Sequence, residues 1–497
     1  MGYPPNNCRR RIGAVCVTIA ILAGICRIAS SQTDAAPQRW AYLLINDSEL
    51  LADCPICDRV SIPVPLRGTC MLRLIEATPI LSRFQLENVQ FTAGDRPYRV
   101  SGGGTFEIGG EVAVTQQMRL QLQIDDGFTN TSCYFTNSTI VPGRIWPMMD
   151  VTLSQTNGSA AQVYTLRLAA APVRDLWFST GLAFSSASGS GSPTWIGGGD
   201  LLSMFGHVVK RNADLFTAVG AYPPVPDLGL AAIDMLPGGE IAFSLGSDIT
   251  STTLGLLHHG DLLSSRGRIL RRNHELVAAF GLPPAGPDLG LDAVHSLANG
   301  EILFSIQTNA FSEKLGVTLQ RGDLLSSAGA VLRRNQQLLA GFHPTNGVTD
   351  LGLDALFVWP SGELWFSTEQ DFQDQVLGPI SGGDLLSDQG YIVFRNSDLL
   401  RAFTPAASPT DLGLDALFVV TDILPAAPSP RIRIEVTRDS PDVGLNWSGP
   451  GRVFQVERAD GMPGPFQPWG FILPNRSAID SGALTNRSQF YYRIRQW

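Results

Sequence analysis

The sequence predicts an all-β protein made of three β domains. A Gly-Asp-Leu-Leu-Ser segment occurs four times at almost constant spacing. Short stretches in which apolar and polar residues alternate fill the regions before and after these copies. The chain also contains 51 glycines and 33 prolines, which suits many short strands joined by turns. We therefore expect an N-terminal β-sandwich or barrel, a central four-bladed β-propeller and a C-terminal sandwich.

The first 31 residues read as an export signal. Arg9-Arg10-Arg11 precedes an apolar run over 12–25, which is too short for a comfortable membrane span. Small residues before Ser31 predict cleavage after it, and the formal charge then changes from −9 to −13 because four arginines are removed. No other apolar run could span a bilayer, and no basic stripe suggests a nucleic-acid partner. The mature chain is expected to be secreted or surface-associated, without a transmembrane segment.

Four cysteines remain in the mature chain, and all are disulfide candidates: Cys54, Cys57, Cys70 and Cys133. The Cys54-Pro55-Ile56-Cys57 spacing also occurs in redox and zinc motifs. A zinc site would need a second close pair or histidines, and all six histidines lie in the repeats. A redox motif would lie near a βαβ pattern, which is missing. One or two disulfides are favoured.

The segment from Cys54 to Gly68 resembles exported bacterial proteins of unassigned role.

Residues 38–172 show the alternation of half-buried strands. It is clearest over 118–124 and 163–168, where every second residue is apolar. Glycine-rich clusters such as Ser101-Gly102-Gly103-Gly104 are expected to be turns between strands. One apolar and one polar face predict a sandwich or barrel. Residues 169–172 are expected to be the exit linker of this domain.

The four repeats occupy 173–424, with the aspartate of each copy 61, 62 and 61 residues after the previous one. The second copy reads as two strands joined by a two-residue turn at Arg266-Gly267. This register pairs Leu263 with Leu270 and Asp261 with Arg272 on one face. The same register predicts four structural ion pairs: Asp200–Arg211, Asp261–Arg272, Asp323–Arg334 and Asp384–Arg395. The alternative is an exposed pair of little energetic value.

The order of elements within the repeats predicts a closed ring. Each hairpin is followed by an asparagine that is expected to cap a short helix, and then by Asp-Leu-Gly-Leu and Phe-Ser segments. The array begins at Asp175–Ser179, the second strand of a unit, and ends at Leu414–Val419, a first strand. The last segment could complete the first unit, as in propellers. A linear solenoid is the second possibility, and it would leave both half-units exposed.

The C-terminal region, 431–497, follows a proline-rich linker at 424–430. Its Leu445-Asn446-Trp447 strand, the strand holding Phe454 and Val456, and the final Phe490–Ile494 strand resemble a fibronectin type III domain. The resemblance covers about 67 residues, fewer than the roughly 100 of a typical sandwich of this kind. It implies a spacer or adhesive module.

Paired aspartates in three repeats suggest calcium as the one possible cofactor, because hard cations prefer carboxylate oxygens. The candidates are Asp288, Asp292, Asp350, Asp354, Asp411 and Asp415. Ala231 interrupts the first copy. The competing interpretation, which we favour, is that the first aspartate of each pair caps a turn through its own backbone.

These observations favour a non-enzymatic exported binding or scaffold protein whose partner is an extracellular protein or glycan. The alternative is a hydrolase or lyase that acts on an extracellular polymer in the propeller channel. An enzyme would need residues unique to one unit to converge in that channel. Asp248, His258 and His259 are the only cluster of this kind that the sequence indicates.

Overall fold

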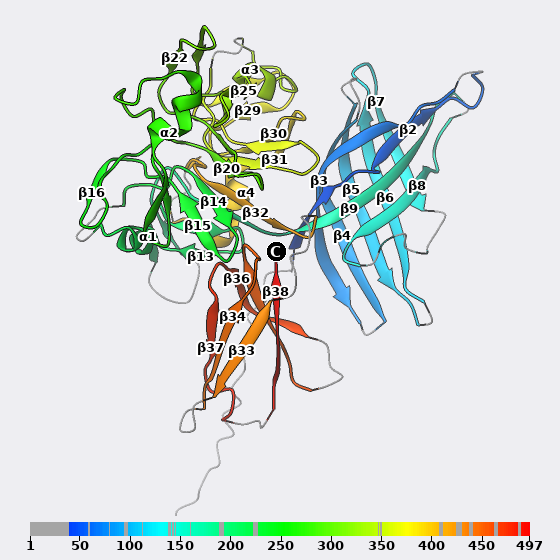
Figure 1. Cartoon of the computed structure of the whole chain (residues 1–497). Coiled ribbons are helices and arrows are strands. Elements are labelled where there is room, and N and C mark those ends of the chain that lie inside the picture. Colours follow the sequence, from blue (N-terminus) through cyan, green and yellow to red (C-terminus); the bar gives the residue numbers. More distant parts are fainter. Residues whose placement is uncertain are drawn as a thin grey trace, which may run out of the picture. The chain divides into compact units, whose positions relative to one another are not determined.

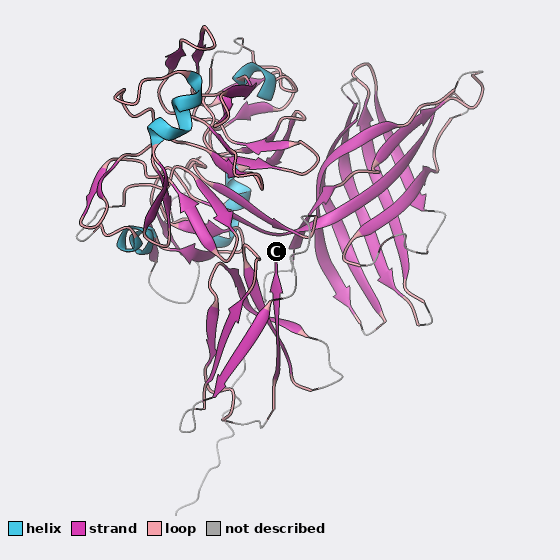
Figure 2. Cartoon of the chain, in the orientation of Figure 1, coloured by secondary structure: helices cyan, strands magenta, loops and turns pink. Residues whose placement is uncertain are grey.

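The computed structural model describes residues 39–497 except 58–59, 79, 94–97, 112, 138–140, 142–143, 145, 160, 188–192, 222–226, 346, 348–349, 407–410, 424–429, 437–440, 462–465 and 486–488. The predicted export signal and most of the linker at 424–430 lie outside the described residues. Strands make up most of this part of the chain, and its short helices all lie in the repeat region (Figure 2). The all-β class is therefore confirmed. No helix in the described ranges combines the length and apolar character needed to cross a membrane.

The N-terminal region is a sheet that closes on itself. Pairing runs from β1 through β3, β4, β5, β6, β7 and β8 to β9, and β9 returns to β1 (blue to green in Figure 1). β2 continues the position of β1, since it also pairs with β3 and β9. The strands are β1 (Arg39–Leu44), β2 (Glu49–Asp53), β3 (Val64–Ala77), β4 (Leu81–Ala93), β5 (Tyr98–Gly109), β6 (Thr115–Asp125), β7 (Asn130–Asn137), β8 (Met149–Gln155) and β9 (Val163–Phe178).

Alternate residues of these strands form one apolar core. In β6, for example, Met118, Leu120, Leu122 and Ile124 are buried, while Arg119 and the glutamines between the others are exposed. Two expectations for this region were wrong. Residues 101–104 lie inside β5, and 169–172 lie inside β9, where they pair with β1 and β8. β9 therefore runs without interruption through the predicted domain boundary.

The end of β9 and the residues after 178 build four groups of four paired strands; the first group is continuous with the N-terminal sheet, and the other three are separate sheets. The first sheet combines the end of β9 with β12 (Leu201–Ser203), β13 (His207–Lys210) and β32 (Leu417–Thr421). The others are β14 (Ile233–Leu236), β15 (Glu240–Phe243), β18 (Leu262–Ser264), β19 (Arg268–Arg271); β20 (Val294–Ser296), β21 (Ile302–Phe304), β24 (Leu324–Ser326), β25 (Ala330–Arg333); and β26 (Leu356–Val358), β27 (Leu364–Phe366), β30 (Leu385–Ser387), β31 (Tyr391–Phe394). Because β32 pairs with β9, the last segment of the array completes the first sheet, with Leu417 opposite Phe178.

The four sheets are linked in a cycle. Their first strands, β14, β20, β26 and β32, each contact the next, and β32 contacts β14 again. The serine of each Phe-Ser segment is fully buried, and its hydroxyl donates to a leucine carbonyl that belongs to the following sheet. These four bonds are Ser179–Leu230, Ser244–Leu291, Ser305–Leu353 and Ser367–Leu414, at 2.6–2.8 Å. The Phe-Ser segment thus ties neighbouring sheets together.

Each unit adds a two-stranded hairpin and a short helix. The hairpins are β10 (Phe184–Ser186) with β11 (Thr194–Ile196), β16 (Ile249–Ser251) with β17 (Gly255–Leu257), β22 (Ala310–Ser312) with β23 (Val317–Leu319), and β28 (Phe372–Asp374) with β29 (Gly378–Ile380). The helices are α1 (Asn212–Ala218), α2 (Asn273–Val277), α3 (Asn335–Leu338) and α4 (Asn396–Leu399), with 3-10 turns η1 (Ala278–Phe280) and η2 (Arg401–Phe403).

The register of the repeated hairpin differs from the prediction near its turn. Ser264 pairs with Arg268, so the turn has three residues, and Gly267 supplies the left-handed conformation that it needs, with φ 76°. Leu263 then pairs with Ile269, so the predicted pairing of Leu263 with Leu270 was wrong. A bulge at Leu270 restores the predicted register, because Leu262 pairs with Arg271. Asp261 and Arg272 consequently face each other as expected.

The repeated asparagine has a different role from the one predicted. It is the first residue of each helix, and the arginine before it holds the N-cap position. The buried Asn273 amide donates to the carbonyls of Gly260 and Gly290 and accepts the Leu289 amide. Asn273 therefore joins the hairpin to the Asp-Leu-Gly-Leu segment, because a buried amide needs such partners.

The C-terminal region consists of two sheets of three strands. The first is β33 (Arg431–Val436), β34 (Val443–Ser448) and β37 (Ser477–Asp480), and the second is β36 (Gln467–Leu473), β35 (Phe454–Ala459) and β38 (Tyr491–Gln496). Trp447, Phe454, Val456 and Ile494 belong to one core cluster of this region. Apolar residues that alternate along β34 and β35 place these side chains on the same inner face.

Candidate functional site

The four Asp–Arg pairs occupy the same place in every repeat. The arginine Nη1 lies 2.5–2.6 Å from the aspartate Oδ2 in all four copies: Asp200–Arg211, Asp261–Arg272, Asp323–Arg334 and Asp384–Arg395. Each carboxylate is buried, whereas each guanidinium is roughly one-third exposed. Asp261 also accepts the backbone amides of His258 and Asn273. The pairs therefore hold hairpin and helix together and are structural.

The first aspartate of each Asp-Leu-Gly-Leu segment caps a turn. Asp288, Asp350 and Asp411 each accept the amide of the glycine two residues later. In the described part of the chain, no three His, Cys, Asp or Glu side chains are grouped so that they could hold a metal ion. The geometry therefore gives no support to calcium at Asp288/Asp292, Asp350/Asp354 and Asp411/Asp415.

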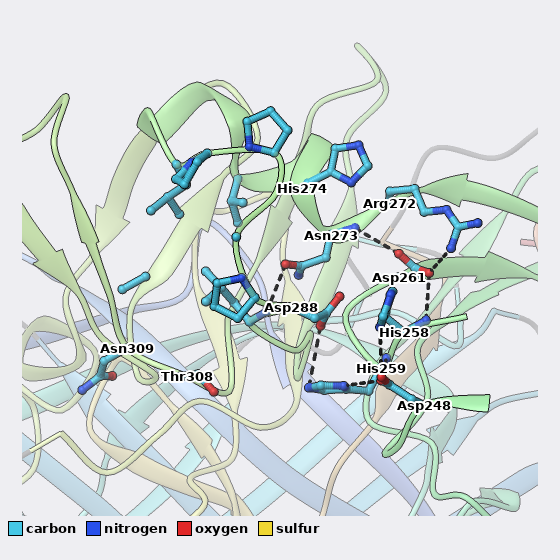
Figure 3. A pocket seen from close by; sticks show the side chains of 18 residues that line it. Asp248, His258, His259, Asp261, Arg272, Asn273, His274, Asp288, Thr308 and Asn309 are labelled. Carbon is cyan, nitrogen blue, oxygen red and sulfur yellow. Dashed lines mark hydrogen bonds and ion pairs between the residues drawn. The ribbon is translucent and has the colours of Figure 1, made fainter. Parts of the chain in front are cut away.

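A cavity of about 640 Å³ opens beside the second repeat and reaches the first strand of the β22–β23 hairpin (Figure 3). We call it the His–Asp pocket. It is lined by Asp248, His258, His259, Asp261, Arg272, Asn273, His274, Val277, Leu282, Pro283, Pro284, Gly286, Pro287, Asp288, Leu289, Thr308, Asn309 and Ala310. Its volume lies within the range of small-ligand sites. The cluster that the sequence indicated, Asp248 with His258 and His259, forms one side of it.

One carboxylate holds both neighbouring imidazoles. Asp248 Oδ2 lies 2.9 Å from His258 Nδ1, and Asp248 Oδ1 lies 2.7 Å from His259 Nδ1. Oδ1 also accepts the His259 amide at 2.9 Å. Burial acts to raise the pKa of Asp248, but the hydrogen bonds from His259 and His258 outweigh it and lower that pKa to about 2. Because an ionised carboxylate only accepts, both Nδ1 atoms carry protons, and Nε2 is the remaining nitrogen of each ring.

Asp288 is used differently in this repeat than in the others. In the other three copies, the equivalent Asp227, Asp350 and Asp411 accept the amide of the glycine before the repeated aspartate. Among the described residues, the Gly260 amide makes no such bond, and Asp288 Oδ1 lies 3.7 Å from His259 Nε2 (Figure 3). The sequence difference that accompanies this is His259, which replaces Gly198, Arg321 and Gly382 of the other copies.

A second group of acidic residues lies near the first strands of the sheets. Asp292, Asp354 and Asp415 each come two residues before β20, β26 and β32, which contact one another in sequence. Glu369 lies close to them and receives Arg321 Nη1 at 2.5 Å. Gln307 Nε2 donates to Asp292 Oδ1 at 2.5 Å. We call Asp292, Asp354, Asp415 and Glu369 the axial acid cluster.

The pKa of every carboxyl group in the axial acid cluster is raised. Burial is the largest cause and raises the pKa of Asp292 and Asp415 to about 7. Burial, followed by the neighbouring charges of Asp415, Asp292 and Glu369, also raises the pKa of Asp354.

The prediction for the cysteines was partly right. Cys54 and Cys57 form a disulfide, whereas Cys70 and Cys133 are free, buried thiols in the core of the N-terminal sheet. Their strands place them as small apolar residues on the inner face, which sequence spacing alone does not reveal. The disulfide assignments of Cys70 and Cys133 were therefore wrong.

Arg321, Gln307 and Glu369 were not predicted as functional residues, although a signal for two of them was present in the repeats. At the position of Gln307 and Glu369 the other two copies have Gly181 and Gly246. When a large polar residue replaces glycine in only two of four repeats, that residue is a candidate for a role that the other two repeats do not share. Comparison with protein-family models and with curated proteins gives no match for this chain.

Proposed function

We propose that this chain is an exported binding protein whose repeat region is a four-bladed propeller and whose ligand binds in the His–Asp pocket. The cyclic contact of first strands and the pairing of β32 with β9 support the propeller. The signal-like residues 1–31 and the Cys54–Cys57 bond support export. Two three-stranded sheets around Trp447 support a fibronectin type III-like spacer.

The observation that carries this proposal is that His258 and His259, which no other repeat has at these positions, lie in the pocket beside repeated residues such as Asp288. The Asp–Arg pair recurs in every unit, as expected of a structural element. Asp248, His258 and His259 occur together in one unit, and they converge on a cavity of ligand size. A wall of proline side chains completes the cavity, and preformed apolar walls with a few polar groups are typical of binding sites.

A pocket-filling substitution tests the proposal. Ala310 lines the pocket, and the equivalent residue in the fourth repeat is Phe372, so the fold accepts a phenyl ring at this position. We expect Ala310→Phe to keep the melting temperature within about 2 °C and to abolish binding of any ligand found by a thermal-shift screen of saccharides and peptides. Ile249→Phe, at the same position of the second repeat but outside the pocket lining, is the matched control. Binding that survives Ala310→Phe would place the ligand elsewhere.

A second function, polymer cleavage by a hydrolase or lyase, is favoured by the axial acid cluster. Carboxyl groups with a pKa near 7 suit general acid–base catalysis, and Arg321 could neutralise an acidic polymer. The test is release of reducing ends from neutral and acidic polysaccharides by the mature chain. Turnover that Asp354→Asn reduces at least about a hundredfold would support this function. Absence of turnover on all polymers, or turnover unchanged in Asp354→Asn, would exclude it.

A further inference from the structure

We propose that the His–Asp pocket recognises a saccharide through neighbouring hydroxyl groups. This inference rests on the proposed binding function and adds the chemical class of the ligand. It follows from the hydrogen-bonding groups that the pocket leaves open, from the charges already compensated inside it, and from the shape of its apolar wall.

One side of the pocket offers acceptors. Both Nδ1 atoms face Asp248, so Nε2 is the ring nitrogen of His258 and His259 that is left for a ligand. His259 Nε2 lies only 3.7 Å from Asp288 Oδ1. This distance is too long for a direct hydrogen bond, so a hydroxyl group of a ligand could bond to both atoms. Two adjacent O–H groups of one ligand would fit this arrangement.

The opposite side of the pocket offers donors. Asn309 Oδ1 already accepts the Arg321 amide at 2.9 Å, and among the described residues the Asn309 NH₂ group has no hydrogen bond of its own. Thr308 presents a hydroxyl beside it (Figure 3). A ligand in the cavity therefore meets the His259 ring nitrogen and the Asp288 carboxylate on one side and donors at Asn309 and Thr308 on the other.

This combination excludes several ligand classes. An ammonium or guanidinium group only donates and would leave the Asn309 amide unsatisfied. Phosphate, sulfate and carboxylate groups only accept, and they would face the negative charge of Asp288. A metal ion lacks a sufficient ligand group among the described residues. A hydroxyl both donates and accepts, so a polyhydroxylated ligand satisfies both sides.

The apolar wall favours a ring-shaped polyol. Val277, Leu282, Pro283, Pro284 and Pro287 all line the cavity. Proline side chains are rigid, so they form a preorganised surface against which the C–H face of a sugar ring can pack without further loss of entropy.

Calorimetric titration of the mature chain tests the inference. The probes are glucose, galactose, mannose, N-acetylglucosamine and their β-linked disaccharides, with arginine methyl ester and zinc chloride as alternative ligands. We expect one saccharide to bind and Asp288→Asn to weaken it at least about tenfold, because a hydrogen bond to a charged group is lost. Asp411→Asn, the same change at the equivalent turn of the fourth repeat, should leave affinity within about twofold.

Each other outcome has a definite meaning. Binding of arginine methyl ester or zinc alone, abolished by Ala310→Phe, would overturn the saccharide class while leaving the pocket as the binding site. Saccharide binding that is insensitive to both Ala310→Phe and Asp288→Asn would overturn the inference and place the sugar site elsewhere. Absence of binding by every probe and by every member of the thermal-shift screen would overturn both the inference and the proposed function.

Discussion

Replacing Asp384 by alanine should destabilise the repeat region more than replacing its partner Arg395 by glutamine. Asp384 is buried and accepts three hydrogen bonds: the amide of Asn396 at 2.9 Å, the amide of Ser381 at 3.2 Å and Arg395 Nη1 at 2.6 Å. Arg395 is more than one-third exposed and also donates to the Pro379 carbonyl at 2.7 Å. The local hydrogen bonds therefore depend more on the Asp384 carboxylate than on the Arg395 guanidinium.

The magnitude follows from these contacts. Asp384→Ala leaves two backbone amides without their acceptor, at about 1 kcal/mol each, and an unpaired but solvated arginine adds about 1 kcal/mol. The total of about 3 kcal/mol corresponds to a decrease of roughly 6–12 °C in melting temperature for a domain of this size. Arg395→Gln keeps both amide bonds and should cost about 1 kcal/mol, or roughly 2–4 °C.

Differential scanning calorimetry of the mature chain at low and high salt measures both effects. The loss in Arg395→Gln should become smaller at high salt, because a partly exposed ion pair is screened. The loss in Asp384→Ala should persist, since most of it comes from backbone amides. Equal decreases in the two variants, or a decrease below about 2 °C in Asp384→Ala, would refute the structural role assigned to this repeated aspartate.

Three further predictions concern the ring, the axial acid cluster and the thiols. Val419→Asp should lower the melting temperature by more than about 10 °C, because Val419 is fully buried in β32 opposite Leu176, whereas Leu256→Asp at a half-exposed site should have little effect. Burial raises the pKa of Asp292 and Asp415 to about 7 and also that of Asp354, so the folded state binds more protons than the unfolded state. The stability contributed by these protons is present at low pH and is lost between about pH 4 and 7; Asp354→Asn should therefore raise the melting temperature at pH 8 and not at pH 4, and the reverse order would contradict the assignment. Burial raises the pKa of the Cys70 thiol to about 12, so neither Cys70 nor Cys133 should react with a thiol reagent before unfolding, and both should react afterwards.

The sequence was most informative where four copies could be compared. A fixed separation between Asp261 and Arg272 identified the ion pair in every unit, even though the turn between them has three residues instead of two. The turn shifts the observed pairing by one residue from the prediction, and the bulge at Leu270 shifts it back, so the far end of the hairpin has the predicted register. A single sequence cannot locate such a bulge, because Leu270 looks like its apolar neighbours.

Other features depend on tertiary contacts that local patterns do not encode. Gly102 and Gly104 lie within a strand, and these positions need glycine because the neighbouring strand leaves no room for a side chain. A Cβ on Gly104 would be 2.0 Å from the Arg119 carbonyl oxygen. The sequence predicts a turn from the same glycines.

The pocket could be predicted from the sequence only in part. Non-repetition marked His258 and His259, but the change at Asp288 appears only when the hydrogen bonds of the four copies are compared.

Strand β9 has a consequence for how the chain folds as it emerges from the ribosome. Its first half completes the N-terminal sheet using residues that are synthesised early, whereas its second half must wait for β32. Arg174 and Asp422, which are bonded to each other beside this junction, are 248 residues apart in the chain. Until the later segment arrives, the outer edge of β9 has unpaired amides and carbonyls that could bind a wrong strand. Slow or paused synthesis near the end of the repeats should therefore increase aggregation, while a separately supplied peptide corresponding to 414–423 should suppress it.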